Sequence, residues 1–332
     1  MKTFSESDLK GLYRPPKDSH KGQNGRVLVI GGSKLFHSSI FWSADTASRW
    51  VDLVHFTSPA NENNEVVRKR IKEGFWGGIV VDWGDIDSYI EEDDVVLIGP
   101  GMTRSLEREI PNSKFQITDG EQISNDQNVS DNRAIEQSSD LDEAAKSDDT
   151  EEIVNTLLKR YPEKRWVVDG GALQEVDPKL LNGNMIVTPH RGELKRMVDK
   201  TNDEFLISNF QFLNNDQTTN DEIQKRGEYL SRLSEKLNRA TVLSKAVVDV
   251  VVKDEEVVIV EGGNEGLTKG GTGDILAGLT AAFYCKNDSM LAAAAASYVV
   301  KKAADKLYGE RGTFYNAADV IEGVGRVIKM IY

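Results

Sequence analysis

RVLVIGGS, residues 26–33, is the run of residues from which the fold class can be predicted. Its apolar residues follow one another without a polar break, and the run then ends in two glycines and a serine. Strands that are buried on both faces of a parallel sheet have this composition, whereas strands with one exposed face alternate apolar and polar residues. We therefore predict a buried parallel strand here, with a functional turn at its carboxyl end.

Similar runs recur along the chain and are separated by helical patterns. They are LVHFTSP (53–59), GGIVVDW (77–83), DVVLIGPG (94–101), RWVVDGG (165–171), MIVTPHRGE (185–193), TVLSKAVVDVVV (241–252) and VVIVEGG (257–263). This alternation predicts an α/β fold with a doubly wound, mainly parallel sheet flanked by helices, in a single domain over residues 1–332. Ligands of such sheets bind outside the carboxyl ends of the strands, so we expect the chemistry at that edge.

Two segments do not follow the pattern. Residues 111–150 are strongly acidic and poor in large apolar residues, so they cannot bury enough surface to offset the entropy of ordering. We predict a disordered acidic insertion there. We predict a second irregular stretch over residues 199–222, a loop packed beside the site.

Composition excludes several classes of function. A net charge of −13 opposes a nucleic-acid partner, because phosphate binding requires a basic face. No apolar run is long enough for a signal peptide or a membrane span, and the scattered histidines make no metal motif. We therefore expect a cytoplasmic protein with no membrane partner and no side-chain metal site. The chain is compatible with a homo-oligomer.

The loop NEGLTKGGTGDILAGL, residues 264–279, predicts a pocket for an anion. Gly270, Gly271 and Gly273 precede an apolar helical run, and consecutive backbone N–H groups at a helix N-terminus bind phosphate oxygens. Asp274 lies in the first turn, where it can act as a base or can simply stabilise the helix N-terminus. Both interpretations of this loop stay open from the residues alone.

Five strings in a fixed order carry a family resemblance: NGRVLVIGGS (24–33), LIGPG (97–101), VVDGGAL (167–173), VTPHRGE (187–193) and GGTGDILAGL (270–279). Together they resemble the NAD(P)H-hydrate dehydratase family of the ribokinase-like superfamily. The resemblance implies a ribokinase-like fold and a lyase that repairs hydrated NADH or NADPH. The hydrate hydroxyl is phosphorylated with ADP or ATP and Mg²⁺, and phosphate is then eliminated.

The resemblance also implies roles for individual residues. Asp274 matches the catalytic base, which contacts the substrate, and the backbone of Gly271 and Gly273 matches the groups that stabilise the transferring phosphoryl group. The other predicted substrate contacts are Ser39, Gly101 and His190. The predicted nucleotide site comprises Lys245, Gly270, Gly271, Thr272 and Gly273.

The chain departs from the family pattern at several of these positions. Ala246 replaces a glycine that follows the family lysine, and Ser38 and Ser39 replace a Gly-Ala pair. Met102 and Thr103 follow GPG where a second glycine is usual. Asp169 in VVDGGAL can orient water, Mg²⁺ or a ribose, or can cap the next turn.

Two other functions remain open alongside the dehydratase. One is a small-alcohol kinase of the same superfamily, for a thiamin precursor or a sugar. The other is a non-catalytic nucleotide-binding protein. Thiamin-precursor kinases tend to carry cysteine where this chain has Asp274, and sugar kinases tend to show Gly-Ala-Gly-Asp, so the loop favours the dehydratase. Because the first glycine-rich strand begins at Arg26, we expect no fused epimerase domain and a separate epimerase in the same pathway.

Overall fold

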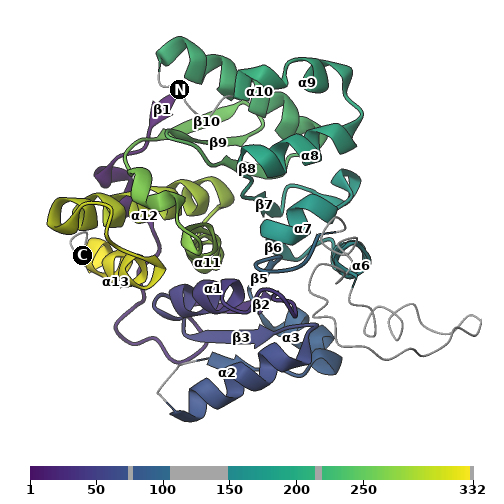
Figure 1. Cartoon of the computed structure of the whole chain (residues 1–332), viewed down its shortest axis with the longest axis vertical. Helices are drawn as coiled ribbons and strands as arrows, with labels where there is room; N and C mark the ends of the chain where they lie inside the picture. Colours follow the sequence, from purple (N-terminus) through teal and green to yellow (C-terminus); the bar gives the residue numbers. More distant parts are fainter. Residues whose placement is uncertain (74–77, 105–148, 214–218, 330–332) are drawn as a thin grey trace, which may run out of the picture.

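The computed structural model describes residues 1–73, 78–104, 149–213 and 219–329 (Figure 1). Their strands form one ten-stranded sheet in the order β1-β10-β9-β8-β7-β6-β5-β2-β3-β4. The strands are β1 (Lys2–Thr3), β2 (Arg26–Ile30), β3 (Leu53–Thr57), β4 (Gly78–Val80), β5 (Val95–Ile98), β6 (Arg165–Val168), β7 (Met185–Val187), β8 (Thr241–Ser244), β9 (Asp249–Lys253) and β10 (Glu256–Val260).

Most neighbouring strands in this sheet are parallel. The strands from β4 through β3, β2, β5, β6 and β7 to β8 pair in parallel, and β1 pairs in parallel with β10. Strand β9 is antiparallel to both of its neighbours, β8 and β10. The predicted mainly parallel sheet is confirmed, but the run 241–252 forms two antiparallel strands joined by a tight turn instead of one strand.

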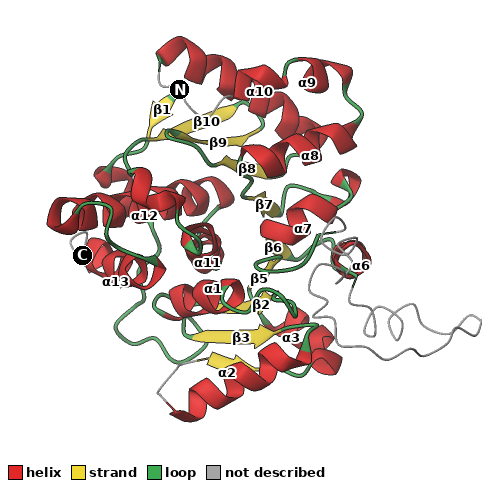
Figure 2. Cartoon of the chain, viewed as in Figure 1, coloured by secondary structure: helices red, strands yellow, loops and turns green. Residues whose placement is uncertain are grey.

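Helices cover both faces of the sheet (Figure 2). One layer contains α1 (Ser39–Ser48), α2 (Asn61–Glu73), α11 (Thr272–Tyr284), α12 (Ser289–Arg311) and α13 (Ala317–Lys329). The other contains α3 (Ile86–Glu92), α6 (Thr150–Arg160), α7 (Gly170–Glu175), α8 (Arg191–Thr201), α9 (Glu204–Ser208) and α10 (Asn220–Lys236). Short 3₁₀ helices are η1 (Glu6–Gly11), η2 (Trp83–Asp85), η3 (Pro178–Leu180), η4 (Phe210–Leu213) and η5 (Glu265–Thr268).

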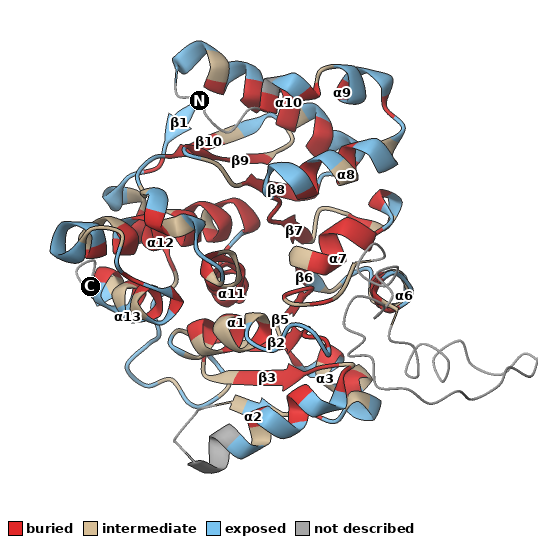
Figure 3. Cartoon of the chain, viewed as in Figure 1, coloured by how far each residue is buried: buried red, intermediate tan, exposed pale blue. Residues whose placement is uncertain are grey.

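Strand β2 shows why the apolar runs form this sheet. Val27 and Val29 belong to the core under the α1 layer, whereas Leu28 and Ile30 belong to the core under the α6 layer. Successive side chains of a strand point to opposite faces, so a strand between two helical layers needs apolar residues at every position. The buried interior therefore runs along both sides of the sheet (Figure 3).

The structure describes the two segments that depart from the strand pattern to different extents. Most of the predicted insertion 111–150 lies outside the described residues. At its end, Asp149 accepts hydrogen bonds from Glu151 N and Glu152 N, and α6 begins at Thr150. Within 199–222, most described residues belong to helical elements, namely the end of α8, α9, η4 and the start of α10. Asp203 caps α9, and Leu206 is buried. That part of the irregular-loop prediction was wrong.

Within the parts of the chain that the structure describes, none of the helices combines the length and the apolar character that crossing a bilayer requires.

Candidate active site

The predicted site residues meet at one edge of the sheet. Strands β2, β5, β6, β7 and β8 are consecutive parallel neighbours, so their carboxyl ends share that edge. The segments that follow these strands carry Ser39, Gly101, Asp169, His190 and Lys245 in the same order. Helix α11 directs its N-terminus, with Asp274 in its first turn, toward the same group.

Lys245 lies among buried carboxyl groups. Its Nζ is 3.0 Å from Oδ1 of Asp169 and 3.7 Å from Oε2 of Glu193, and both acids are almost fully buried. Thr188 Oγ1 donates a hydrogen bond of 2.6 Å to the same Oδ1 of Asp169. Asp169 is thus a fixed partner of Lys245, and its side chain does not cap the helix that follows it.

His190 caps helix α8 with its side chain. Its Nδ1 accepts hydrogen bonds from Gly192 N at 2.9 Å and Glu193 N at 3.3 Å, so this nitrogen carries no proton. The Glu193 carboxylate in return accepts a bond of 2.9 Å from His190 N. Burial, and then the Lys245 charge, hold the pKa of His190 below its usual value. The ring is therefore neutral near pH 7, and Nε2 can donate a hydrogen bond.

Asp274 contacts Ser39, and Ser39 contacts Gly101. The Ser39 hydroxyl donates a hydrogen bond to the Asp274 carboxyl group. Gly101 has a φ of +69°, and a Cβ atom there would lie 3.1 Å from the Ser39 Cβ. Glycine is required at this position by both the left-handed backbone and the close approach. Two predicted substrate contacts thus adjoin the predicted base.

The electrostatics of this cluster favour proton exchange near neutral pH. Burial, and then the nearby charge of Asp169, raise the pKa of Asp274 to about 7. Burial also raises the pKa of Glu193 above its usual range. Burial alone would lower the pKa of Lys245, but the carboxylates of Asp169 and Glu193 outweigh it and hold that pKa above its usual value. Lys245 therefore stays charged while Asp274 can both accept and release a proton.

The glycine loop is shaped by packing as well as by backbone conformation. Gly271 caps α11 with a φ of +95°, and a Cβ there would lie 2.9 Å from the Ala317 Cβ and 3.0 Å from Trp42 Cδ1. A Cβ at Gly273 would lie 3.7 Å from Lys245 Nζ, whereas Gly270 has open space around it. The Thr272 hydroxyl donates to the carbonyl oxygens of Leu267 and Lys269 in the same loop. Its proton therefore stabilises the loop conformation.

A cavity of about 360 Å³ opens beside the cluster. Its walls come from the turn after β8, the loop before α11, the start of α11 and the middle of α12. Its lining residues are His190, Lys245, Ala246, Asp249, Leu267, Thr268, Thr272, Gly273, Leu276, Ser297, Val300 and Lys301. Of the predicted nucleotide positions, Lys245, Thr272 and Gly273 line this cavity together with His190, whereas Gly270 and Gly271 are not among its lining residues.

Sequence reasoning missed three polar residues of this cavity. Asp249, Ser297 and Lys301 line it and are buried. The available signals were an acid inside the apolar run VVDVVV and a lysine inside an apolar helical stripe. Ala246, which replaces a glycine of the family pattern, donates its N–H to Asp249 Oδ1 at 2.8 Å.

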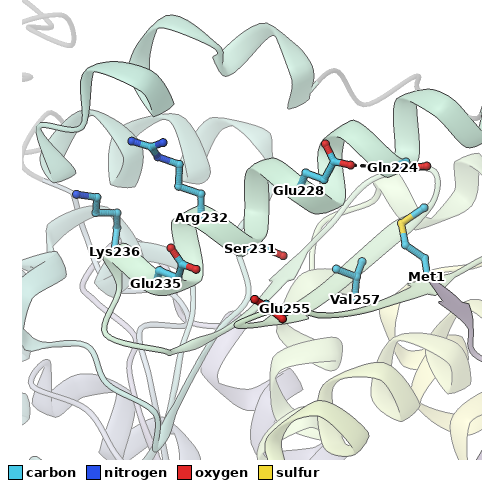
Figure 4. A pocket seen from close by; sticks show the side chains of 9 residues that line it. All are labelled: Met1, Gln224, Glu228, Ser231, Arg232, Glu235, Lys236, Glu255 and Val257. Carbon is cyan, nitrogen blue, oxygen red and sulfur yellow. Dashed lines mark hydrogen bonds between the residues drawn. The ribbon is translucent and has the colours of Figure 1, made fainter.

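A larger cavity of about 680 Å³ lies between α10 and strand β10 near the edge of the sheet (Figure 4). Its lining includes Arg232 and Lys236, which both pair with Asp203. None of the predicted site residues contributes to its walls. The volume of this cavity does not by itself indicate a chemical function.

The described residues contain no group of three or more histidine, cysteine or acidic side chains arranged to hold a metal ion. Magnesium, however, usually binds one or two carboxylates together with waters and substrate phosphates. Asp169 and Glu193 are oxygen donors of that kind beside the loop. The donor set therefore suits Mg²⁺ that arrives with a phosphate ligand, and not a metal held by the protein alone.

Curated relatives resemble nearly the whole chain. The "Bifunctional NAD(P)H-hydrate repair enzyme Nnr" of Methanocaldococcus jannaschii is 27% identical over 331 residues, which is 97% of this chain and 52% of the relative. The "ADP-dependent (S)-NAD(P)H-hydrate dehydratase" of Cenarchaeum symbiosum is 27% identical over 316 residues, covering 94% of this chain and 91% of the relative. The chain spans about half the length of the bifunctional relatives that it matches.

Solved structures share the fold. A ribokinase-like superfamily protein of Enterococcus faecalis superposes with a TM-score of 0.70 at 20% identity, over 99% of this chain and 96% of that one. The ADP/ATP-dependent NAD(P)H-hydrate dehydratase of Bacillus subtilis, co-crystallised with ATP/Mg²⁺ and soaked with CoA, gives a TM-score of 0.64 at 16% identity, over 100% and 99% of the two chains. These likenesses confirm the ribokinase-like fold.

The family profile supplies the decisive comparison. The profile described as NAD(P)H-hydrate dehydratase matches residues 141–326, which is more than half of the chain and includes the glycine loop, Asp274, His190 and Lys245. The family expected from the sequence strings is confirmed. The chain belongs to the NAD(P)H-hydrate dehydratase family.

Proposed function

We propose that this chain restores NADH or NADPH from the hydrated cofactor at the expense of a nucleotide. The observation that carries the proposal is Asp274, a carboxyl group with a pKa raised to about 7, in the first turn of the helix that follows the glycine loop. A proton acceptor beside an anion pocket suits the phosphorylation of an alcohol. Family membership supports the same reaction.

In this proposal, each residue of the cluster has one task. Asp274 accepts the proton of the hydrate hydroxyl while Ser39 holds its carboxyl group in place. Backbone N–H groups around Gly271 and Gly273 bind the phosphoryl oxygens at the positive end of α11. Lys245 supplies a permanent positive charge, kept in position by Asp169. His190 and Gly101 contact the substrate, and the cavity beside Lys245 takes the nucleotide.

We propose ADP as the phosphoryl donor, because the relative of Cenarchaeum symbiosum is named for ADP. A second relative of that name, from Nitrosopumilus maritimus, is 26% identical over 334 residues. Mg²⁺ would neutralise charge on the phosphates, and Asp169 and Glu193 are the carboxylates that would hold it. The Bacillus subtilis dehydratase was co-crystallised with ATP/Mg²⁺, which is consistent with such a requirement.

The same two relatives are named for the S form of the hydrate, and we propose that form as the substrate. A separate epimerase that converts the other epimer, a cytoplasmic location and action without nucleic acid or membrane remain predictions from the sequence.

The test is recovery of the reduced-nicotinamide absorbance when the protein meets NADH hydrate, Mg²⁺ and either ADP or ATP. Recovery with ADP is the expected result, and an Asp274→Asn protein is the control that should show none. If neither nucleotide restores absorbance while ADP still raises the melting temperature, the dehydratase proposal fails. Turnover of a thiazole, pyrimidine or sugar alcohol would then identify a small-alcohol kinase, and its absence a non-catalytic nucleotide-binding protein.

A further inference from the structure

The turn between β8 and β9 carries both Lys245 and Ala246 of the cavity wall. It spans Lys245–Val248 and joins two antiparallel strands. Its first residue is tied to the segment that follows β7, because Lys245 N donates a hydrogen bond of 2.9 Å to Pro189 O. Most of its other backbone groups are bound by charged side chains that are themselves buried.

Arg226 binds the turn from the α10 side of the sheet. Its exposed fraction is 2%. One guanidinium nitrogen, Nη1, donates to Val248 O at 2.8 Å, and the other, Nη2, donates to Ser244 O at 2.9 Å and Ser244 Oγ at 2.8 Å. One planar side chain therefore binds both the last residue of the turn and the residue before it.

Lys301 binds the turn from the α12 side. Its Nζ donates to Val247 O at 2.7 Å, Gly262 O at 3.1 Å and Ala246 O at 3.3 Å. An ammonium group has three donors, and all three are used here on backbone carbonyls. Lys301 therefore connects the turn to the loop that leads into the glycine-rich segment.

Asp249 completes the set. Its Oδ1 accepts the hydrogen bond from Ala246 N at 2.8 Å and lies 3.5 Å from Lys301 Nζ, while Oδ2 accepts a bond of 2.7 Å from Ser297 Oγ. Helices α10 and α12 lie on opposite faces of β9, which places the turn between the two basic residues (Figure 1). In the same strand, Val251 faces the α12 layer and Val250 faces the α10 layer.

Such an arrangement costs free energy. Burying an ion pair is often no better for stability than packing apolar residues of similar volume. The charged residues surround the one turn that aims Lys245 at Asp169 and Glu193, so their common effect is to fix that lysine.

We propose that Arg226, Asp249 and Lys301 are positioning residues that hold the Lys245–Val248 turn from both faces of the sheet and so fix the Lys245 ammonium and the wall of the cavity. The role of the cavity as the nucleotide site rests on the proposed function. The positioning of Lys245 does not, and it can be measured in the protein without ligands.

The first readout is the position of the Lys245 ammonium in crystal structures of the ligand-free protein. In the wild type, Nζ lies 3.0 Å from Asp169 Oδ1 and 3.7 Å from Glu193 Oε2. Lys301→Met keeps the aliphatic chain and removes the donors, and Arg226→Met does the same on the other face. Both substitutions should break the contact between Lys245 Nζ and Asp169 Oδ1, because the turn that carries Lys245 is no longer held.

The second readout is the KM for ADP, compared with kcat. Lys301→Met should raise the KM on the order of tenfold or more, since small misplacements of binding groups have effects of that size. A purely structural role would lower the melting temperature and the active fraction while leaving the KM and the position of Lys245 as in the wild type. Lys302→Met, the exposed neighbour on α12, is the matched control and should change neither readout.

The outcomes separate this inference from the proposed function. A folded Lys301→Met protein whose Lys245 keeps its wild-type contact with Asp169 would overturn the positioning role, whatever reaction the protein catalyses. If that variant does not fold, Asp249→Asn, which keeps the size of the side chain, replaces it and must displace the same ammonium group. An undisplaced Lys245 in folded Asp249→Asn protein would equally overturn the inference. Absence of dehydratase turnover in the wild type would refute only the proposed function, because the position of Lys245 is measured independently of turnover.

Discussion

Asp274 illustrates how one residue acquires its chemistry from its surroundings. An aspartate in the first turn of a helix is ordinarily stabilised as the anion by the helix dipole. Here burial and the charge of Asp169 outweigh that effect and raise its pKa to about 7. The Ser39 hydroxyl, which hydrogen-bonds to the carboxyl group, opposes the rise. The residue is thus poised to accept a proton near neutral pH, as a general base must be.

We expect Asp274→Asn to reduce turnover strongly while preserving the site. Asparagine keeps the size of the side chain but cannot accept the hydroxyl proton, so kcat should fall by about two to four orders of magnitude. Nucleotide binding, followed by the rise in melting temperature with ADP, should persist. Wild-type turnover in this variant would remove Asp274 from the mechanism.

The pH profile of kcat/KM should rise through about pH 7. The base works only when ionised, and the fraction of Asp274 that is ionised grows as pH passes its raised pKa of about 7. Asp169→Asn removes a nearby negative charge, so it should move the midpoint of this rise to lower pH, whatever it does to the maximal rate. A midpoint that stays in place would assign the rise to another group.

At the scale of elements, the contact between α1 and α11 places the base against the substrate segment. The Ser43 hydroxyl on α1 donates a hydrogen bond of 2.9 Å to Asp274 O on α11. The two helices approach so closely that a Cβ at Gly278 would overlap the Ser43 carbonyl oxygen. Gly278, in the interior of a helix where glycine is otherwise unfavourable, is thus explained by the packing.

Gly278→Ala should therefore destabilise the protein by about 1–3 kcal/mol, the usual cost of overpacking. It should also lower kcat, because α11 carries Asp274 away from Ser39. Gly325→Ala in α13 is the matched control, since no atom lies within 4 Å of a Cβ built there. That control should stabilise the helix by about 0.5–1 kcal/mol. The melting temperatures of both variants test this prediction. An equal change of melting temperature in the two variants would contradict the packing argument.

At the scale of the whole molecule, the buried Asp274 carboxyl group lowers the free energy of unfolding when it ionises. Asp274 has a folded pKa of about 7 and an ordinary value of 3.8, so the folded protein binds its proton more tightly than the unfolded chain does. The contribution of this carboxyl group to the free energy of unfolding is fully present below about pH 4 and is lost as pH rises toward 7. Ionising a buried acid is the physical cause of the loss.

Asp274→Asn should consequently melt at a higher temperature than the wild type at pH 8, by a few degrees. The gain should shrink toward zero as pH falls to about 4, since the wild-type carboxyl group is then neutral as well. Calorimetry of the two proteins across this pH range measures the difference directly. A gain that is independent of pH would mean that ionisation of Asp274 does not cause it.

The apolar runs and the glycine loop could be predicted from the chain alone, because burial on both faces of a strand and a helix that begins at GGTGD are properties of neighbouring residues. RVLVIGGS forms β2 with its first five residues, and GGTGDILAGL begins α11 with Asp274 in its first turn.

The split of 241–252 into β8 and β9 could not be predicted, because the order of apolar residues within the run does not reveal a turn. The side-chain contacts that hold that turn could not be predicted either. Lys301 and Val247 are 54 residues apart, and Arg226 and Val248 are 22 residues apart. Such contacts depend on how two helical layers pack on opposite faces of the sheet, and that packing is decided by the folded chain as a whole, not by any local pattern.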